Sequence, residues 1–333
     1  MAISYKYYKG SPSGDIIEAS GSHSASGTQA LVELSHCGVC GSDEHFRRAD
    51  QGLGHEGVGI IKALGENAGR LSSLKVGDRV GLGWMQKFCG YCDPCLSGRH
   101  FKCENSEQFG SSNLGQGCFG TSVTWDVTAL TKIPDEIPSK FAGPLLCGGA
   151  SVWSPLYEHG MKAGERVGIV GVGGLGHLAI QFASKLGFEP VVFSTTESKK
   201  SEAFGFGATE FHCTSGTDKL QGVAPLKHLL ITTSLLPSLE PYIPVLAPFA
   251  KIFPLTVQFD SFPIPLMPLI LQGLSVVGSA GAHPLSMRAM LDFAAKHNIR
   301  PQIEEFTLSV SGVTNAMQKL KDGDMRYRGV LVI

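Results

Sequence analysis

Four cysteines lie close together in the segment CGYCDPCLSGRHFKC, at Cys89, Cys92, Cys95 and Cys103. The spacing C-x2-C-x2-C-x7-C lets one short stretch of backbone present four thiolates to a single ion, as a closed tetrahedral zinc site requires. Disulfides are one alternative, but nothing else in the chain indicates secretion. An iron–sulfur cluster is another, but bacterial ferredoxin runs bring the fourth cysteine after three residues and follow it with proline. The spacing favours structural zinc.

A second group of potential metal ligands is scattered along the chain. The segments HCGVCGSDEH, GLGHEGVG and PLLCGGAS contribute Cys37, Cys40, His45, His55, Glu56 and Cys147. Each has an ordinary explanation on its own, because a cysteine before an apolar run usually packs in a core. Together they supply two thiolates and one imidazole, the set that leaves the fourth zinc position open in the known case of alcohol dehydrogenase.

The segment ERVGIVGVGGLGHLAIQF contains a G-x-G-x-x-G motif between a strand-like run and a helix-like run. The first glycine permits a tight turn, the second lets the backbone approach a pyrophosphate, and the third allows close packing of helix on strand. The motif alone is weak evidence, but its position between a strand and a helix predicts a dinucleotide site. The loop residues of this site are Gly171, Gly173, Gly174, Leu175 and Gly176.

The end of the next strand, PVVFS, indicates which dinucleotide binds. NAD-binding proteins place an acidic residue there, about 20 residues after the glycines, to bind the ribose 2′-hydroxyl. Here Ser194, Thr195, Thr196 and Lys199 offer three hydroxyls and an ammonium, which suit a 2′-phosphate. Glu197 lies just beyond the strand, and a solvated helix start is the structural alternative. We favour NADP(H).

Length and composition agree with a two-domain enzyme. The 333 residues include 43% hydrophobic and 17% charged residues, with a net charge of −1. A near-neutral chain without basic clusters argues against a nucleic-acid or membrane-surface partner. No run reaches about 18 apolar residues, and the proline-broken residues 241–271 are expected to form buried strands and turns. Nine cysteines, several assignable to metal, fit a reducing, cytoplasmic location.

The pattern of the chain changes near residue 150. Before that point it is rich in glycine and turns, with strand-like alternations such as ALVEL and DRVGLGW, which indicate a β-rich domain. From residue 164 onward strands and helices alternate, which predicts an α/β domain with a parallel sheet and helices on both faces. A further helix is expected at LSMRAMLDFAAKH, before the tail RYRGVLVI.

These motifs together resemble the zinc-dependent medium-chain dehydrogenase/reductase family of alcohol dehydrogenases, most closely its cinnamyl alcohol dehydrogenase-like branch. The resemblance is carried by CGVCGSD, GHEGVGIIKALGENA, the four-cysteine segment, PLLCGGASVWSPL, GVGGLGH, FSTTESKK and DGDMRYRGVLV. It implies a β-rich GroES-like catalytic domain, residues 1–147, completed by residues 298–333. Residues 148–297 would form a Rossmann NADP-binding domain with a doubly wound parallel sheet, and the active site would lie between the domains.

The resemblance also implies roles around a catalytic zinc ion. Cys40, His55 and Cys147 would be its ligands, and Glu56 would be a nearby carboxylate that can exchange onto the metal. Cys37 does not match a ligand of the family and is interpreted as structural. With the four-cysteine site, two zinc ions per chain are expected.

Three further residues beside the metal receive roles from the resemblance. Ser42 would bind the substrate oxygen, His45 would continue the proton relay to solvent, and Asp43 would orient His55. Zinc would polarise a carbonyl and the nicotinamide would deliver hydride.

On the cofactor side, the resemblance implies contacts in addition to the glycine loop. Ser151 and Thr232 match positions near the nicotinamide, and Ser279 and Ala280 match other cofactor-binding positions. Arg328 matches a position from which the family contacts the pyrophosphate.

Several features depart from the family pattern. The segment between Cys40 and His55 is shorter than in typical relatives, and so is the stretch after Cys103. Cys118 and Thr256 stand where relatives usually have glycine. None of these changes removes a metal ligand, but because of them the sequence does not identify the substrate.

Three functions are weighed. The leading hypothesis is an oxidoreductase that interconverts aldehydes, aromatic or allylic, and primary alcohols with NADP(H). The second is an NADPH-dependent reductase of a conjugated C=C or C=N bond in a biosynthetic pathway, and the complete metal and relay set argues against it. The third is a protein that kept the fold without turnover, which Ser42, His45 and Glu56 disfavour. A homodimer is expected from the family.

Overall fold

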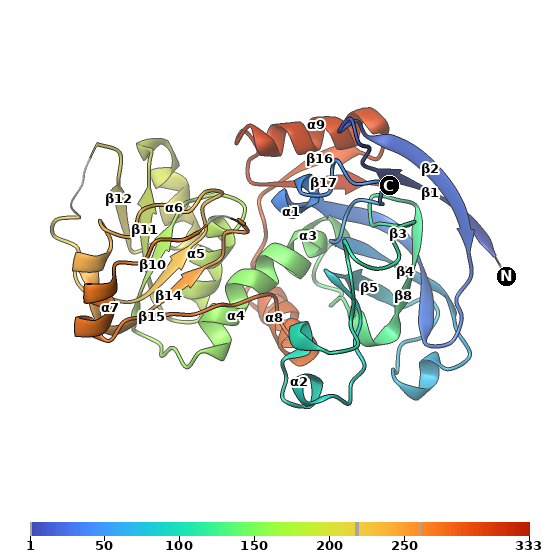
Figure 1. Ribbon diagram of the computed structural model, residues 1–333, viewed down its shortest axis with the longest axis horizontal. Coiled ribbons are helices and arrows are strands. Elements are labelled where there is room, and N and C mark those ends of the chain that lie inside the picture. Colours follow the sequence, from blue (N-terminus) through green and yellow to red (C-terminus); the bar gives the residue numbers. More distant parts are fainter. Residues whose placement is uncertain (1, 217–219, 260) are drawn as a thin grey trace. The chain divides into compact units, whose positions relative to one another are not determined.

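The computed structural model describes residues 2–216, 220–259 and 261–333. The described chain divides into two compact units (Figure 1). Unit 1 contains the residues up to Cys147 together with Ala282–Ile333, and unit 2 contains Gly148–Gly281. Each unit has a principal sheet of its own, mainly antiparallel in unit 1 and parallel in unit 2.

The principal sheet of unit 1 has the strand order β16-β17-β3-β4-β5-β9, and β8 also pairs with β3. The long strand β3 is central because it pairs antiparallel with β4, β8 and β17. The strands are β3 (Gln29–Val39), β4 (Gly57–Leu64), β5 (Arg79–Leu82), β8 (Ser122–Asp126), β9 (Leu130–Lys132), β16 (Ile303–Thr307) and β17 (Arg328–Val332).

Two small sheets and several short helices complete unit 1. The small sheets join β1 (Ile3–Lys9) to β2 (Ile17–His23) and β6 (Met85–Lys87) to β7 (Glu107–Gln108). The α-helices are α1 (Gly41–Glu44), α2 (Asp93–Leu96), α3 (Ser139–Pro144), α8 (Pro284–Lys296) and α9 (Val310–Lys321). Shorter turns are η1 (Ala68–Arg70), η2 (His100–Lys102), η3 (Val127–Ala129) and the π-helical η4 (Leu145–Gly149).

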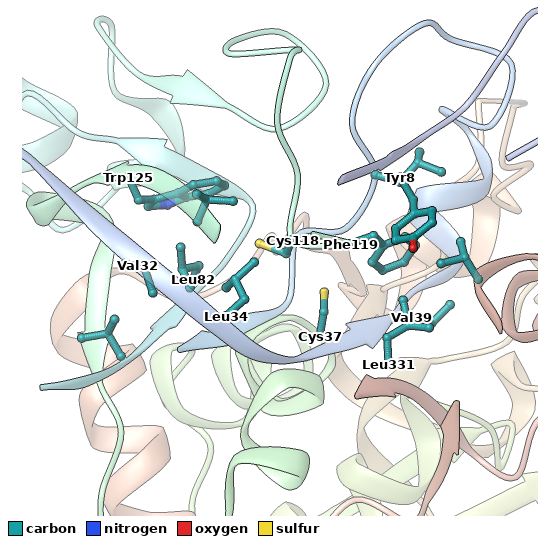
Figure 2. Close-up of a cluster of buried hydrophobic side chains, with 14 of the residues drawn as sticks. Tyr8, Val32, Leu34, Cys37, Val39, Leu82, Cys118, Phe119, Trp125 and Leu331 are labelled. Carbon is teal, nitrogen blue, oxygen red and sulfur yellow. The ribbon is translucent and has the colours of Figure 1, made fainter. Parts of the chain in front are cut away.

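The core of unit 1 packs around β3. Figure 2 shows apolar side chains from several segments around this strand, among them Trp125, Phe119 and Leu331. Cys37 and Cys118 are fully buried in the same core. Neither belongs to a group of residues that could hold a metal ion, so within the described residues they act as small apolar side chains.

Unit 2 is built on a parallel sheet with the strand order β12-β11-β10-β13-β14-β15. Its inner strands are apolar runs buried on both faces, as parallel sheets covered by helices require. The strands are β10 (Arg166–Val170), β11 (Glu189–Ser194), β12 (Glu210–Cys213), β13 (Leu226–Ile231), β14 (Leu246–Pro254) and β15 (Ser275–Val276). The helical elements are α4 (Ala150–Glu158), α5 (Gly176–Lys185), η5 (Glu197–Lys199), α6 (Lys200–Phe206), η6 (Ile243–Val245) and α7 (Leu266–Gln272).

The strand–turn–helix alternation predicted after residue 164 is confirmed by β10, α5, β11 and α6. The expectation of strands and turns throughout residues 241–271 is wrong for α7, which is a helix with no buried residue. Its proline Pro268 lies in the first turn, where a missing N–H costs little. Gly273 ends the helix with a left-handed φ of 64°.

The amino-acid sequence and the contacts in the structure place the end of the second domain at different residues. The helix α8 contacts β9 and belongs to unit 1, so the contact-based boundary follows Gly281. The sequence placed this boundary at residue 297, and that boundary stays a prediction. The first boundary is Cys147 in both divisions.

An apolar face is exposed on unit 2. Leu266, Met267, Ile270 and Leu271 of α7 are 60–76% exposed, and Phe249 of β14 is 77% exposed. In α7, Leu266 and Ile270 are four residues apart, and so are Met267 and Leu271, so the four side chains share one face of the helix. Among the described helices, none is long and apolar enough to cross a membrane.

Candidate functional site

Four potential metal ligands converge in unit 1. Cys40 follows β3, His55 and Glu56 precede β4, and Cys147 lies in η4. One ligand atom from each of the four lies within 4.8 Å of the others. The antiparallel pairing of β3 with β4, with Cys37 opposite Gly57, brings the first two segments together.

The donor atoms fit a tetrahedral zinc ion. The Sγ atoms of Cys40 and Cys147 are 3.9 Å apart. Two thiolates at about 2.3 Å from a tetrahedral ion would be separated by about 3.8 Å, whereas a disulfide would need about 2 Å. The Nε2 atom of His55 is buried and has no hydrogen-bond partner among the described residues. An unsatisfied imidazole nitrogen beside two thiols is expected where a metal binds.

Asp43 holds the imidazole in position. Its Oδ1 atom accepts hydrogen bonds from His55 Nδ1 at 2.9 Å and from the Gly54 N–H at 3.2 Å. Its Oδ2 atom accepts from the Cys40 N–H at 3.0 Å. A proton on Nδ1 leaves Nε2 as the atom that faces the two thiols, which is the role the sequence assigned to Asp43.

The groups of this centre perturb one another's proton affinities. The hydrogen bond with Cys147 lowers the pKa of the Cys40 thiol well below its ordinary value, against the effect of burial. The same bond and burial raise the pKa of Cys147. Burial opposes the charged form of His55, but the Asp43 carboxylate outweighs it and raises the pKa. A cation at the same place would favour both thiolates and the neutral imidazole.

Glu56 is paired with Arg328, which the sequence did not predict. The Arg328 guanidinium donates a hydrogen bond to Oε1 of Glu56, and both side chains are buried. Burial raises the pKa of Glu56 to about 7, and Arg328 opposes this shift. The contact of Arg328 with a pyrophosphate stays a prediction, since in unit 1 its partner is the carboxylate.

Two aromatic rings lie against His55, a third packs on both of them, and the sequence predicted none of the three. The ring centroids of Trp84 and Phe109 lie 5.1 and 5.0 Å from that of His55. Phe46, from the shortened segment after Cys40, packs on Phe109 at 5.1 Å and on Trp84 at 6.0 Å. Since these residues come from three separate segments, no spacing in the sequence indicates their contact.

Ser42 and His45 lie on the same short segment as Cys40. Ser42 is in α1 and is partly exposed, and His45 follows this helix and is exposed. The structure therefore places both residues next to a candidate ligand, with His45 nearer to solvent.

The four cysteines of the segment CGYCDPCLSGRHFKC also converge, and one sulfur atom from each lies within 4.8 Å of the others. The Sγ atoms of Cys89 and Cys95 are 3.9 Å apart. The Cys89 N–H donates to Cys103 Sγ and the Cys92 N–H donates to Cys89 Sγ, each at 3.4 Å. All nine cysteines are unpaired. Sulfur atoms that accept backbone N–H groups and lie at this separation fit a closed tetrahedral zinc site.

In unit 2 the glycine motif forms the predicted turn between β10 and α5. Gly171 has a left-handed φ of 97°, which a residue with a side chain adopts at a cost. A Cβ atom on Gly176 would overlap the Gly171 carbonyl oxygen, whereas a Cβ on Gly173 would meet nothing within 4 Å. The first and third glycines are therefore needed by the fold, and the second leaves space at the loop for a ligand. Gly174 and Leu175 complete the loop before α5.

The segment at the end of β11 contacts this loop through Lys199. The Ser194 hydroxyl accepts a hydrogen bond from the Thr196 N–H at 3.3 Å. Lys199 donates from Nζ to the Val172 carbonyl oxygen at 2.9 Å, so its charge lies against the glycine turn. Thr195 and Thr196 are exposed. The structure thus brings hydroxyls and an ammonium to one edge of the turn.

The remaining candidates of unit 2 are distributed over three segments. The Thr232 hydroxyl donates to the carbonyl oxygens of Val170 at 2.8 Å and Gly171 at 3.1 Å, which ties the end of β13 to the glycine turn. Ser151 lies on α4, and the Ser279 hydroxyl donates to Ser154 of the same helix at 3.1 Å. Ala280 is exposed.

Comparison with known proteins agrees with these sites. Residues 26–135 match the family described as alcohol dehydrogenase GroES-like domain, and residues 174–296 match zinc-binding dehydrogenase. The aldehyde reductase AdhA of Synechocystis sp. is 34% identical over 309 residues, which are 90% of each chain. The chain belongs to the zinc-dependent alcohol dehydrogenases.

Solved structures place this alcohol dehydrogenase in the cinnamyl alcohol dehydrogenase branch. A cinnamyl alcohol dehydrogenase from Sorghum bicolor superimposes with a TM-score of 0.91 at 26% identity, covering 100% of this chain and 98% of that one. A CAD from Helicobacter pylori, complexed with NADP(H), gives 0.88 at 25% identity, covering 100% and 99%. The predicted family and its combination of a GroES-like and a Rossmann fold are confirmed.

We expect the variant Cys95→Ala to unfold at a temperature lower by about 5 °C or more, because the binding energy of a structural zinc ion is folding energy. Thermal unfolding, followed by circular dichroism with and without a strong chelator, measures the effect. Cys213→Ala, at a partly exposed cysteine outside both clusters, is the control. Equal stability of the Cys95 variant and the wild type would show that this cluster holds no structural ion.

Proposed function

We propose that this alcohol dehydrogenase interconverts aromatic or allylic aldehydes and primary alcohols, with NADP(H) as the hydride carrier and zinc at Cys40, His55 and Cys147. The observation that carries the proposal is the convergence of two thiols with the buried, unpartnered Nε2 atom of His55. With the four-cysteine cluster, we propose two zinc ions per chain.

The chain's own residues orient the reactants and move a proton. Bound zinc supplies a Lewis acid for the carbonyl oxygen, and NADPH supplies the hydride to the carbonyl carbon. Asp43 keeps Nδ1 of His55 protonated, so that Nε2 stays available as a ligand. The Ser42 hydroxyl donates a proton to the substrate oxygen as the C–H bond forms. His45, exposed after α1, returns a proton from solvent to Ser42. Alcohol oxidation reverses these steps.

The edge of the glycine turn supports NADP(H) as the cofactor. A 2′-phosphate needs hydrogen-bond donors and positive charge, and Ser194, Thr195, Thr196 and Lys199 provide them. Glu197, the acidic residue of this segment, is exposed in η5 beyond the strand and forms an ion pair with Lys200 at 3.4 Å. Its charge is therefore compensated locally.

The aromatic rings around His55 support a flat, apolar substrate. Trp84 and Phe46 are partly exposed, whereas Phe109 is 3% exposed and packs against both of them. Aromatic rings prefer offset or edge-to-face contacts with other rings. Rings next to the metal candidates favour an aromatic or allylic aldehyde over a polar sugar-like one.

We also propose a homodimer and a cytoplasmic location. The apolar face of α7, with Leu266, Met267, Ile270 and Leu271, lies close in sequence to the short strand β15 at the edge of the parallel sheet. A second copy would cover this face and extend the sheet. Nine cysteines without disulfides, six of them in the two candidate metal clusters, need a reducing compartment.

The first test of the proposed function is deuteride transfer from labelled NADPH or NADH to cinnamaldehyde, analysed by mass spectrometry and NMR. We expect label at the former carbonyl carbon, from NADPH. The variants Cys40→Ala and His55→Ala should lose at least about a thousandfold of this activity and one of the two zinc ions. Label at an alkene carbon would replace the proposal by conjugate reduction. Retention of both ions in the variants would remove the metal assignment.

Replacement Ser194→Asp should shift the preference from NADPH toward NADH by about tenfold or more, which corresponds to roughly 1.4 kcal/mol. The new carboxylate would repel the 2′-phosphate and accept a hydrogen bond from a ribose 2′-hydroxyl. The ratio of kcat/KM for the two cofactors measures the shift. Ser238→Asp, an exposed serine elsewhere in unit 2, adds the same charge and should leave the ratio unchanged. An unchanged ratio for Ser194→Asp would contradict the phosphate site.

Replacement Leu271→Lys should convert the dimer to a monomer at micromolar concentration, because a charge would be buried in the proposed contact. Size-exclusion chromatography with light scattering gives the mass of each species. Leu71→Lys, at a leucine of unit 1 that is 58% exposed, is the control. A wild type that is monomeric, or a Leu271 variant that stays dimeric, would show that α7 is not the interface.

A further inference from the structure

The Glu56 carboxylate is confined on two sides. On one side the Arg328 guanidinium donates a hydrogen bond to Oε1. On the other side lies the backbone of Gly38 in β3, and a Cβ atom on this glycine would overlap Oε2. The same Cβ would lie 3.0 Å from Cδ and 3.1 Å from Cβ of Glu56. The side chain of Glu56 thus fills the space that a first side-chain carbon at position 38 would need.

The glycine is required here for space and not for its backbone conformation. Gly38 lies inside a strand and is not among the residues with positive φ, so an alanine could adopt the same dihedral angles. The requirement comes from one neighbour, the Glu56 side chain.

The backbone at Gly38 has little freedom to retreat. Its N–H donates to the Glu56 carbonyl oxygen at 3.1 Å, and Gly38 pairs with Val330 of β17. From α3, Gly143 packs against both segments, since a Cβ there would lie 2.8 Å from the Glu56 carbonyl oxygen and 3.0 Å from the Gly38 nitrogen. In an alanine variant the carboxylate would move more readily than the strand.

The candidate metal ligands lie close to the Glu56 carboxylate. The strand closes one side and Arg328 occupies another, while the donor atoms of Cys40, His55 and Cys147 lie within 4.8 Å. The Oε2 atom is buried and has no hydrogen-bond partner among the described residues. The point where the three donors converge is therefore within reach of a carboxylate pushed from Gly38.

We propose that Gly38 is a positioning residue, which keeps the Glu56 carboxylate withdrawn from the metal by leaving room behind it. Arg328 supplies the attraction, and the missing side chain of Gly38 supplies the space. The fourth position beside Cys40, His55 and Cys147 thereby stays open for the substrate oxygen. This inference rests on the proposed zinc site.

The test compares Gly38→Ala with Gly41→Ala, whose added Cβ would meet nothing within 4 Å. Both variants and the wild type are loaded with Co²⁺, whose visible spectrum reports coordination, and are titrated with imidazole as an added ligand. We expect imidazole to change the spectra of the wild type and of Gly41→Ala but not that of Gly38→Ala. We also expect Gly38→Ala to release its metal to a chelator about tenfold more slowly, as for a site with a further ligand contact. Its kcat should fall more than its KM changes.

An imidazole response and a release rate equal to those of the wild type in Gly38→Ala would overturn the inference. Failure of the zinc proposal is recognised separately, because the spectrum of the Co²⁺-loaded wild type would then be unchanged by Cys40→Ala. The four-cysteine cluster contributes equally to all these spectra.

A thermal-stability cycle on the metal-free protein covers the case in which Gly38→Ala folds poorly. If the clash with the carboxylate causes the instability, Gly38→Ala costs much less stability in a Glu56→Ala background, where Arg328 is already unpaired, than in the wild type. If Gly38→Ala costs the same in both backgrounds, the strand itself needs the glycine and the inference is wrong.

Discussion

The antiparallel pairing of β3 with β4 and β17 is the constraint on which the proposed zinc site of unit 1 depends. It places Cys40 at the end of one strand beside His55 and Glu56 at the start of the next, and it brings Arg328 from the far end of the chain to the same place. Glu56 and Arg328 are separated by 272 residues in sequence, and the sheet holds them at contact distance. A register shift of one residue would turn them to the other face.

Burial makes each charged group of this centre depend on the others. A buried carboxylate or guanidinium without a partner costs several kcal/mol, whereas a hydrogen-bonded pair offsets much of that cost. Asp43 is fully buried with hydrogen bonds to both its oxygens, and Glu56 shares its charge with Arg328. Among the described side chains of this centre, His55 Nε2, Glu56 Oε2 and Arg328 Nε have no hydrogen-bond partner. Of these atoms, His55 Nε2 is the acceptor that the proposed zinc ion would satisfy.

The sequence predicted what local spacing and periodicity encode. The four-cysteine cluster and the glycine turn between β10 and α5 were predicted from local spacing, and the ligand candidates Cys40, His55 and Cys147 from the family resemblance. The pair of Glu56 with Arg328, and the rings of Trp84 and Phe109 beside His55 with Phe46 packed on them, were not predicted, because these contacts join distant segments without a repeating pattern. The helix α7 was missed because its prolines were read as strand or turn residues, although a first helical turn accepts proline.

Gly171 and Gly38 differ in the same way, since the sequence motif explains the first glycine and only a contact between distant segments explains the second. Gly171 needs its left-handed φ for a turn, and the motif around it reveals that need in the sequence. Gly38 has ordinary strand geometry, and its lack of a side chain is explained only by Glu56, which reaches it across the sheet. A glycine within a strand weakens that strand, so its presence there needs a compensating reason. Here the reason is the position of the Glu56 carboxylate relative to the proposed zinc ligands. The strand β3 therefore contributes to the proposed zinc site in two ways, through the space at Gly38 and through Cys40, which follows the strand.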